Sequence, residues 1–166
     1  MRTDAQPIAA GEDLALPWDL RDWTSGEALR RWIAEDIGTL DWNNPPVVEF
    51  LRQRPGFDPK ACLCLLPYAY ATAVFESDEI YRKCLADAEY KAIVGEGWRM
   101  EARGITRFRR ENRGLLKWAL VQLFKRALRA RFGDFRLPTG LKRRLVNAAV
   151  TRLDLARQLD RGHDGL

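Results

Sequence analysis

Arginines are the side chains in this sequence whose type and spacing best suit a binding chemistry. The stretch GITRFRREN, residues 104–112, holds three of them, and more lie on both sides of it. A guanidinium offers a planar fork of N–H donors that fits phosphate oxygens and the edge of guanine bidentately. The candidate set for contacts with a polyanion comprises Arg99, Arg103, Thr106, Arg107, Arg109, Arg110, Arg113 and Lys117.

A helix would divide this stretch into two faces. At 100° per residue, Ile105, Phe108 and Asn112 fall within one narrow sector, which suits a core. The opposite sector receives Arg103, Thr106, Arg107 and Arg110, with Arg109 and Arg113 at its flanks. We expect the four residues of the outer sector to face a duplex and the two flanking arginines to contact its phosphates.

The net charge of +5 conceals a strong asymmetry along the chain. Residues 1–96 carry a net charge of −7, whereas residues 97–144 carry 15 Lys and Arg against three acids. Most charged runs are simply solvated helix surfaces. Here the excess has one sign and centres on the arginine-rich stretch, which favours a polyanionic partner such as double-stranded DNA.

Other chemistries find little support in the sequence. Gly95-Glu96-Gly97-Trp98 does not fit a phosphate-binding loop. The single histidine, His163, lies in the tail, away from any serine or cysteine it could activate in a packed site. Cys62, Cys64 and Cys84 lack a fourth zinc ligand and suit buried, reduced thiols. We therefore expect no enzymatic activity, no cofactor and no metal.

Helices are the elements that must position the arginines. No segment alternates convincingly with period two, so the sequence predicts no sheet. The helix from Pro59 to Phe75 is hydrophobic nearly all round and should be the most buried, with Pro67 kinking it or displacing a hydrogen bond. A capping box over residues 24–27, a cap at Ser77 and the apolar periodicity predict the helices. They lie near residues 25–38, 45–51, 59–75, 78–94 with a break near Asp87, 103–112, 115–132, and from 139 onward.

A single all-α domain accounts for the chain. Its 166 residues are 46% hydrophobic, which is enough for one sizeable core. No apolar run is long enough to span a membrane, and the start MRTDAQPIAAGED lacks the apolar core of a secretory signal. We expect a compact multi-helix domain over residues 14–160, a flexible N-terminus over 1–13, a frayed tail over 161–166, and a cytoplasmic location.

A helix-turn-helix unit is the first hypothesis for how the arginine-bearing helix is held. A helix beginning near Ser77, a turn containing Gly95 and Gly97, and the helix of residues 104–112 follow one another in the order that this motif requires. The first helix would support the second through its apolar residues. The outward arginines could then enter the major groove.

A wider pattern resembles a known family of DNA-binding domains. Four segments carry it: Tyr68-Ala69-Tyr70-Ala71-Thr72, Glu76-Ser77-Asp78-Glu79-Ile80, Ala88-Glu89-Tyr90-Lys91-Ala92-Ile93 and Ile105-Thr106-Arg107-Phe108-Arg109. In this order they are similar to the N-terminal domain of bacterial insertion-sequence transposases of the DDE type. The upstream stretch LPWDLRDWTSGEALRRWIAEDIGTLDWN also resembles the leader of that family. The resemblance covers residues 14–132 and implies a DNA-binding helix-turn-helix domain.

The sequence departs from the family pattern in three places. Met100-Glu101-Ala102-Arg103-Gly104 stands where the family has Pro-Asp-His-x-Thr, so the recognition helix loses a threonine near its start and gains an arginine. Pro67 interrupts the leucine-rich helix. The catalytic domain, which carries three metal-binding carboxylates in such transposases, does not follow. The resemblance therefore implies a DNA-binding half without its nuclease.

These observations leave two classes of function open. In the first, the protein binds double-stranded DNA by sequence, without catalysis, and regulates transcription or transposition at the nucleoid. In the second, it is an interaction module that forms a homodimer or pairs with a full-length transposase, and the basic face is incidental. A transposase remnant without a selected role is a third alternative. Steep salt dependence of DNA binding supports the first class, and no binding at moderate salt supports the second.

Overall fold

The computed structural model describes residues 16–41, 59–96, 98, 100–133 and 139–164. Over these ranges the regular elements are helices, and extended backbone pairs only in an isolated bridge between Asp19 and Thr72. The all-α fold class predicted from the sequence is therefore confirmed. The helix predicted over residues 45–51 and the candidate Arg99 lie outside the described residues.

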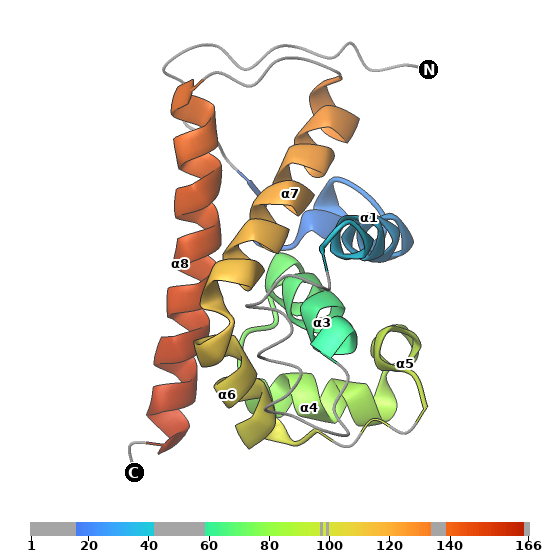
Figure 1. The fold of residues 1–166 in the computed structure, drawn as a ribbon, viewed down its shortest axis with the longest axis vertical. Coiled ribbons are helices and arrows are strands. Elements are labelled where there is room, and N and C mark those ends of the chain that lie inside the picture. Colours follow the sequence, from blue (N-terminus) through green and yellow to red (C-terminus); the bar gives the residue numbers. More distant parts are fainter. Residues whose placement is uncertain (1–15, 42–58, 97, 99, 134–138, 165–166) are drawn as a thin grey trace.

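In this described part, seven α-helices and one short 3-10 helix pack around one core (Figure 1). α3 lies at the centre, and the two longest helices, α7 and α8, run in opposite directions beside it. α4, α5 and α6 gather at the end of the molecule where α8 finishes. No helix within the described ranges is long and apolar enough to cross a membrane. The bounds are η1 Leu20–Asp22, α1 Gly26–Gly38, α3 Pro59–Ala71, α4 Ser77–Ala86, α5 Ala88–Val94, α6 Ala102–Glu111, α7 Arg113–Phe132 and α8 Thr139–Asp164.

α3 is the most buried of these helices, as its composition predicts. Of its 13 residues, 11 are buried, including Tyr68 and Tyr70, which are both 0% exposed. An all-apolar helix can be surrounded by other helices without burying unpaired charges. Pro67 lies within the helix and is itself buried, so the helix accommodates it. α3 therefore forms the base on which the other helices pack.

α3 ends at Ala71, four residues before the predicted end at Phe75. The cause is a left-handed residue, Ala73, with φ of 64°. Beyond it the N–H of Val74 turns back and donates to the carbonyl oxygen of Ala69 at 2.9 Å. This is the six-to-one hydrogen bond of a Schellman motif, and it satisfies a carbonyl at the helix end.

Local caps set most of the other helix ends. Ser25 caps α1, since its Oγ accepts from the N–H of Ala28 at 3.0 Å, one residue later than a capping box starting at Thr24 implies. Asp87 separates α4 from α5 and caps α5, which confirms the predicted break. Gly95 has a φ of 74° and ends α5, as expected from its freedom to adopt positive φ.

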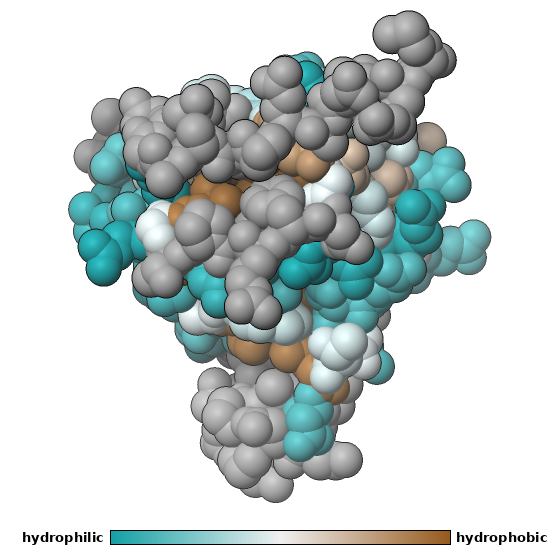
Figure 2. Space-filling view, turned by 90° about the horizontal axis from the view of Figure 1, so that it is seen from above, coloured by the Kyte–Doolittle hydropathy of each residue, from teal (hydrophilic) through white to brown (hydrophobic). Residues whose placement is uncertain are grey.

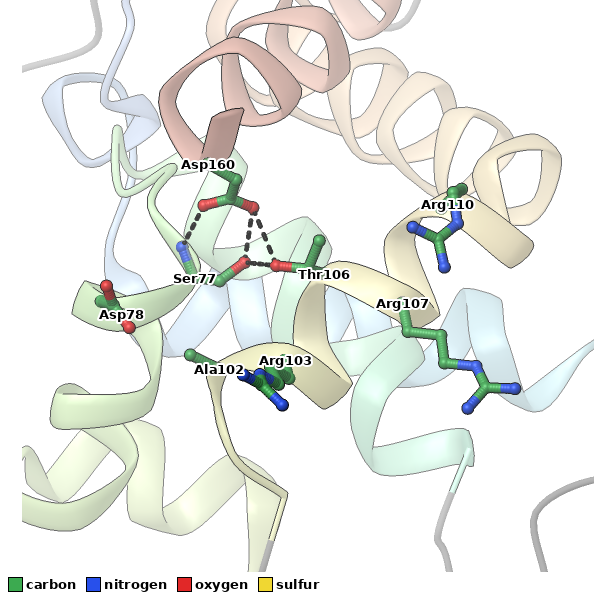
Figure 3. A pocket seen from close by; sticks show the side chains of 8 residues that line it. All are labelled: Ser77, Asp78, Ala102, Arg103, Thr106, Arg107, Arg110 and Asp160. Atoms are coloured by element: carbon green, nitrogen blue, oxygen red, sulfur yellow. Dashed lines mark hydrogen bonds between the residues drawn. The ribbon is translucent and has the colours of Figure 1, made fainter. Parts of the chain in front are cut away.

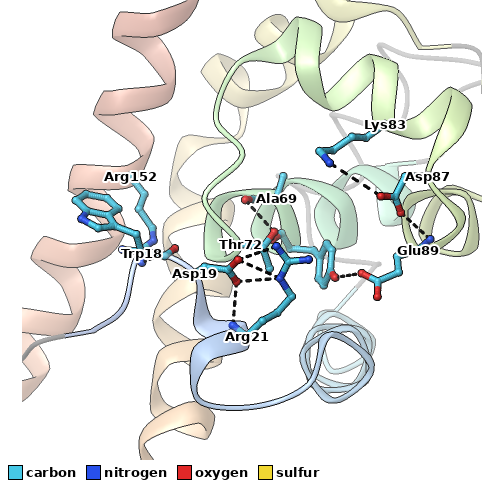
Figure 4. A network of polar contacts seen from close by, with 10 residues as sticks. Trp18, Asp19, Arg21, Ala69, Thr72, Lys83, Asp87, Glu89 and Arg152 are labelled. Carbon is cyan, nitrogen blue, oxygen red and sulfur yellow. Dashed lines mark hydrogen bonds and ion pairs between the residues drawn. The ribbon is translucent and has the colours of Figure 1, made fainter.

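Arg152 ties the N-terminal segment to the core from α8. It is buried, and its guanidinium donates to the carbonyl oxygens of Tyr70 at 3.0 Å and Pro17 at 2.8 Å. It also lies over the rings of Trp18 and Phe124, 4.9 and 5.1 Å from their centroids. Figure 4 shows Arg152 reaching Trp18 from α8. The cation is thus held by carbonyl dipoles and aromatic faces.

A second polar network fastens α5 to α3 (Figure 4). The hydroxyl of Tyr68 donates to the carboxylate of Glu89, and burial together with this hydrogen bond raises the pKa of Tyr68. Arg30 of α1 approaches the same carboxylate at 3.6 Å.

Figure 2 looks down on the end of the molecule where α7 finishes and α8 begins. Hydrophilic residues there surround smaller hydrophobic areas, which fits helices that keep their apolar sides inward.

Candidate nucleic-acid interface

The inner face of α6 is buried, as predicted. Ile105 is 0% exposed and Phe108 is 2% exposed, and both belong to the main core. Asn112 is also buried, and its side-chain amide donates to the carbonyl oxygen of Phe108 at 3.0 Å, which closes the end of the helix. α6 packs chiefly against α4. The core thus fixes which side of α6 faces outward.

Three arginines, Arg103, Arg107 and Arg110, form the exposed face of α6. They line a groove of about 620 Å³ that is also bordered by the start of α4 and by α8 (Figure 3). Arg107 pairs with Glu111 on the same helix at 2.9 Å, yet its side chain stays 58% exposed. Exposed pairs of this kind contribute only about 0.3–0.5 kcal/mol, so a phosphate can replace the carboxylate. Among the described residues, no carboxylate pairs with Arg103 or Arg110.

A buried polar cluster lies beneath this groove. The carboxylate of Asp160, on α8, accepts hydrogen bonds from the backbone N–H of Ser77 at 2.9 Å and from its hydroxyl at 2.7 Å. The hydroxyl of Thr106 lies 2.9 Å from Ser77 Oγ and 3.2 Å from Asp160 Oδ2. Arg109 forms an ion pair with the same carboxylate, and both side chains are less than a tenth exposed. The cluster therefore joins α4, α6 and α8 (Figure 3).

This cluster corrects the sequence predictions for Arg109 and Ser77 and bears on that for Thr106. Arg109 is buried, and its guanidinium is already held by Asp160, so it is not available to the phosphates of a duplex. Burial alone would lower the pKa of Arg109, but Tyr70 and Asp160 raise it above its usual value, so the side chain stays charged. Thr106 is half-buried and its hydroxyl lies close to Asp160, but it also lines the groove, so its contact with DNA stays a prediction. Ser77 is the first residue of α4 rather than its N-cap, because Asp160 accepts from its N–H.

A second basic hollow adjoins the groove at Arg110. It has a volume of about 250 Å³ and lies between α6, the start of α7 and the last turns of α8. A single carboxylate, Asp154, serves two of its arginines, at 2.7 Å from Arg113 and 3.6 Å from Arg157. The lining residues are Thr106, Arg109, Arg110, Arg113, Arg157, Asp160 and Arg161.

Sequence reasoning missed Arg157 and Arg161. The sequence predicts a frayed tail from residue 161, but α8 continues to Asp164. Their spacing of four residues was the available signal, because it places both on one side of a helix. Of the remaining candidates, Arg113 lines the second hollow, whereas Lys117 is exposed on α7 and lines neither.

The arrangement around α6 differs from the predicted helix-turn-helix geometry. That motif joins its two helices by a turn of three or four residues. Here residues 95–101 separate α5 from α6, and α6 packs chiefly against α4. The basic face of α6 is therefore presented by α4 and the buried cluster, and a helix-turn-helix mode of docking stays a hypothesis.

The cysteines lie in the interior or partly so. Cys62 and Cys84 are buried and Cys64 is half-buried, and none of the three forms a disulfide. Burial raises the pKa of Cys84 to about 12, which leaves it protonated at neutral pH. Within the described residues, no three His, Cys, Asp or Glu side chains group as metal ligands would.

The geometry thus brings together arginines from three helices around two connected hollows. Comparisons with protein-family models, curated proteins and solved structures gave no match.

Proposed function

We propose that this protein binds double-stranded DNA, without cutting it, and that α6 faces the duplex. One observation carries the proposal. The exposed arginines of α6 line a groove whose buried acid, Asp160, is already neutralised by Arg109. Asp78 is the other carboxylate of the lining, so an anion in this groove would meet three exposed guanidinium groups against one accessible carboxylate.

The length of α6 and the extent of the surrounding positive charge favour DNA over a small anion. Arg103, Arg107 and Arg110 follow a spacing of four and three residues, so they lie along one side of α6. A helix of ten residues is about 15 Å long, and the major groove of B-DNA admits an α-helix. The basic excess of residues 97–144 extends beyond this helix, which suits a polyanion that releases counterions on binding. A regulator of transcription or transposition is the role that such binding would serve.

Fluorescence anisotropy with a labelled duplex of mixed sequence tests this proposal. The variant Arg107→Ala/Arg110→Ala should keep the fold and bind at least about tenfold more weakly, since each arginine that reads a base edge contributes roughly 1–3 kcal/mol. Arg31→Ala/Arg82→Ala is the matched control. It also removes two exposed arginines, but from α1 and α4. Its affinity should stay within about twofold of the wild type.

Two results would reject the proposal. One is wild-type protein that binds no duplex at moderate salt, which would leave the interaction module as the function. The other is a folded Arg107→Ala/Arg110→Ala variant with wild-type affinity. Selection of bound sequences from a random duplex pool then tests whether recognition depends on sequence, because phosphate contacts alone would enrich none.

A further inference from the structure

We propose that the last turns of α8 form a second arm of the DNA-binding surface, in which the hollow between α6, α7 and α8 holds a backbone phosphate. This inference rests on the proposed DNA binding and extends it to two residues outside the predicted site, Arg157 and Arg161. They face the hollow together with Arg110 and Arg113.

The charge balance of the hollow favours an anion. Four guanidinium groups with surface access line it, and the buried Arg109 lies behind them. Asp160 is occupied by Arg109 and by α4, so it contributes no free negative charge. Asp154 is shared between two arginines whose side chains stay 39% and 52% exposed. The hollow therefore keeps an excess of positive charge at its surface.

The hollow is continuous with the groove along α6. Both are lined by Thr106, Arg110 and Asp160, so the basic surface runs from α6 to the end of α8. Asp160 lies between Arg157 and Arg161 in the sequence and is bonded to α4 and α6. This anchor holds the two α8 arginines at a set position relative to α6. Such preorganisation reduces the entropy lost when an anion binds.

A phosphate fits these donors better than a base edge does. The arginines come from three helices and surround a hollow, whereas base readout needs side chains that extend into a groove of the duplex. Guanidinium forks bind phosphate oxygens bidentately, and contacts of this kind carry no sequence information. The α8 arm should therefore strengthen binding to every duplex alike.

Salt titrations of duplex affinity provide the test, with Arg157→Gln/Arg161→Gln as the main variant. We expect about tenfold weaker binding to all sequences and a salt slope lower by about 1 for each phosphate that the protein no longer neutralises. Lys142→Gln/Arg143→Gln is the control, because it removes the same charge from exposed residues of the first turns of α8. This control should keep the wild-type slope, since it lies more than a Debye length away.

Asp154→Asn adds a variant that should gain affinity. It frees Arg113 and Arg157 from their carboxylate, so binding should tighten by about two- to fivefold.

Equal losses of duplex affinity in the main variant and the control would overturn the inference, because total charge would then explain them. Wild-type affinity in a folded Arg157→Gln/Arg161→Gln protein would overturn it too, while weaker binding of Arg107→Ala/Arg110→Ala would preserve the proposed function. A wild-type protein without DNA affinity would reject both proposals.

Discussion

Asp160 joins three helices through one carboxylate. A buried carboxylate costs several kcal/mol of desolvation unless it is paired and hydrogen-bonded. Here the charge of Arg109 and the N–H and hydroxyl of Ser77 supply that compensation. The same bonds cap α4 and hold α6 against α8. Asp160 is buried, yet it fixes the positions of the helices that carry the exposed arginines.

Asp160→Asn should destabilise the protein by about 3–5 kcal/mol, because it leaves the buried guanidinium of Arg109 without a counter-charge. Asp154→Asn is the matched control on the same helix. Its carboxylate also pairs with arginine, but the side chain is 36% exposed, so its loss should cost less than about 1 kcal/mol. Urea unfolding measures both values. Similar shifts in the two midpoints would contradict a structural role for the buried cluster.

Helical phase accounts for most individual side chains of α6, including one that the sequence prediction misassigns. Ile105, Phe108 and Asn112 are buried as the 100° spacing predicts. Arg109 follows Ile105 by four residues, so it shares the inner side of the helix, and the prediction that it contacts phosphates was wrong. The sequence could not show the partner that makes this burial possible, because Asp160 is 51 residues away.

At the scale of elements, helix starts and ends follow local chemistry where the chain itself supplies the cap. Ser25, Asp87 and Gly95 act within a few residues of their helices, so their roles could be read from the sequence. Periodicity places the end of α3 too late because Ala73 is not a residue that marks a left-handed turn. Alanine adopts positive φ only when the surrounding structure compensates for the strain.

Ala73→Gly should therefore stabilise the protein by about 0.5–1 kcal/mol. Glycine relieves the left-handed strain, and this gain exceeds its larger loss of backbone entropy on folding. Ala34→Gly is the opposite control, since Ala34 is exposed within α1 and the same change there should cost about 0.5–1 kcal/mol. In thermal denaturation, the midpoint temperature should rise for Ala73→Gly and fall for Ala34→Gly. A lower midpoint for both would contradict the strain at Ala73.

At the scale of the whole molecule, an arginine of the basic part of the chain pairs with two carboxylates of the acidic part. Arg126 of α7 contacts Glu35 at 2.8 Å and Asp36 at 2.9 Å, both at the end of α1. The acids near α1 are therefore partly used within the fold. At the other end of the molecule, the arginines of α6 and α8 remain accessible.

The protein should leave supercoiled plasmid DNA intact with Mg²⁺ or Mn²⁺. Metal-assisted cleavage needs clustered carboxylates, and several acids in the described residues instead pair with arginines or cap helices. Gel electrophoresis of the plasmid after incubation measures nicking, and heat-denatured protein serves as the control. Metal-dependent nicking by a pure preparation, abolished on replacing individual acids, would contradict the proposal that the protein does not cut DNA.

Most helix positions, the side of α6 that enters the core and the region where positive charge collects can be predicted from the sequence. Those properties depend on residues a few positions apart, so periodicity, caps and local charge counts reveal them. Packing between helices is needed to pair Arg109 with Asp160, to bring Asp160 to the start of α4, and to place Arg157 and Arg161 beside the arginines of α6 and α7. These contacts link helices that are distant along the chain. They arise because packing α8 against α7 brings its last turns beside α6.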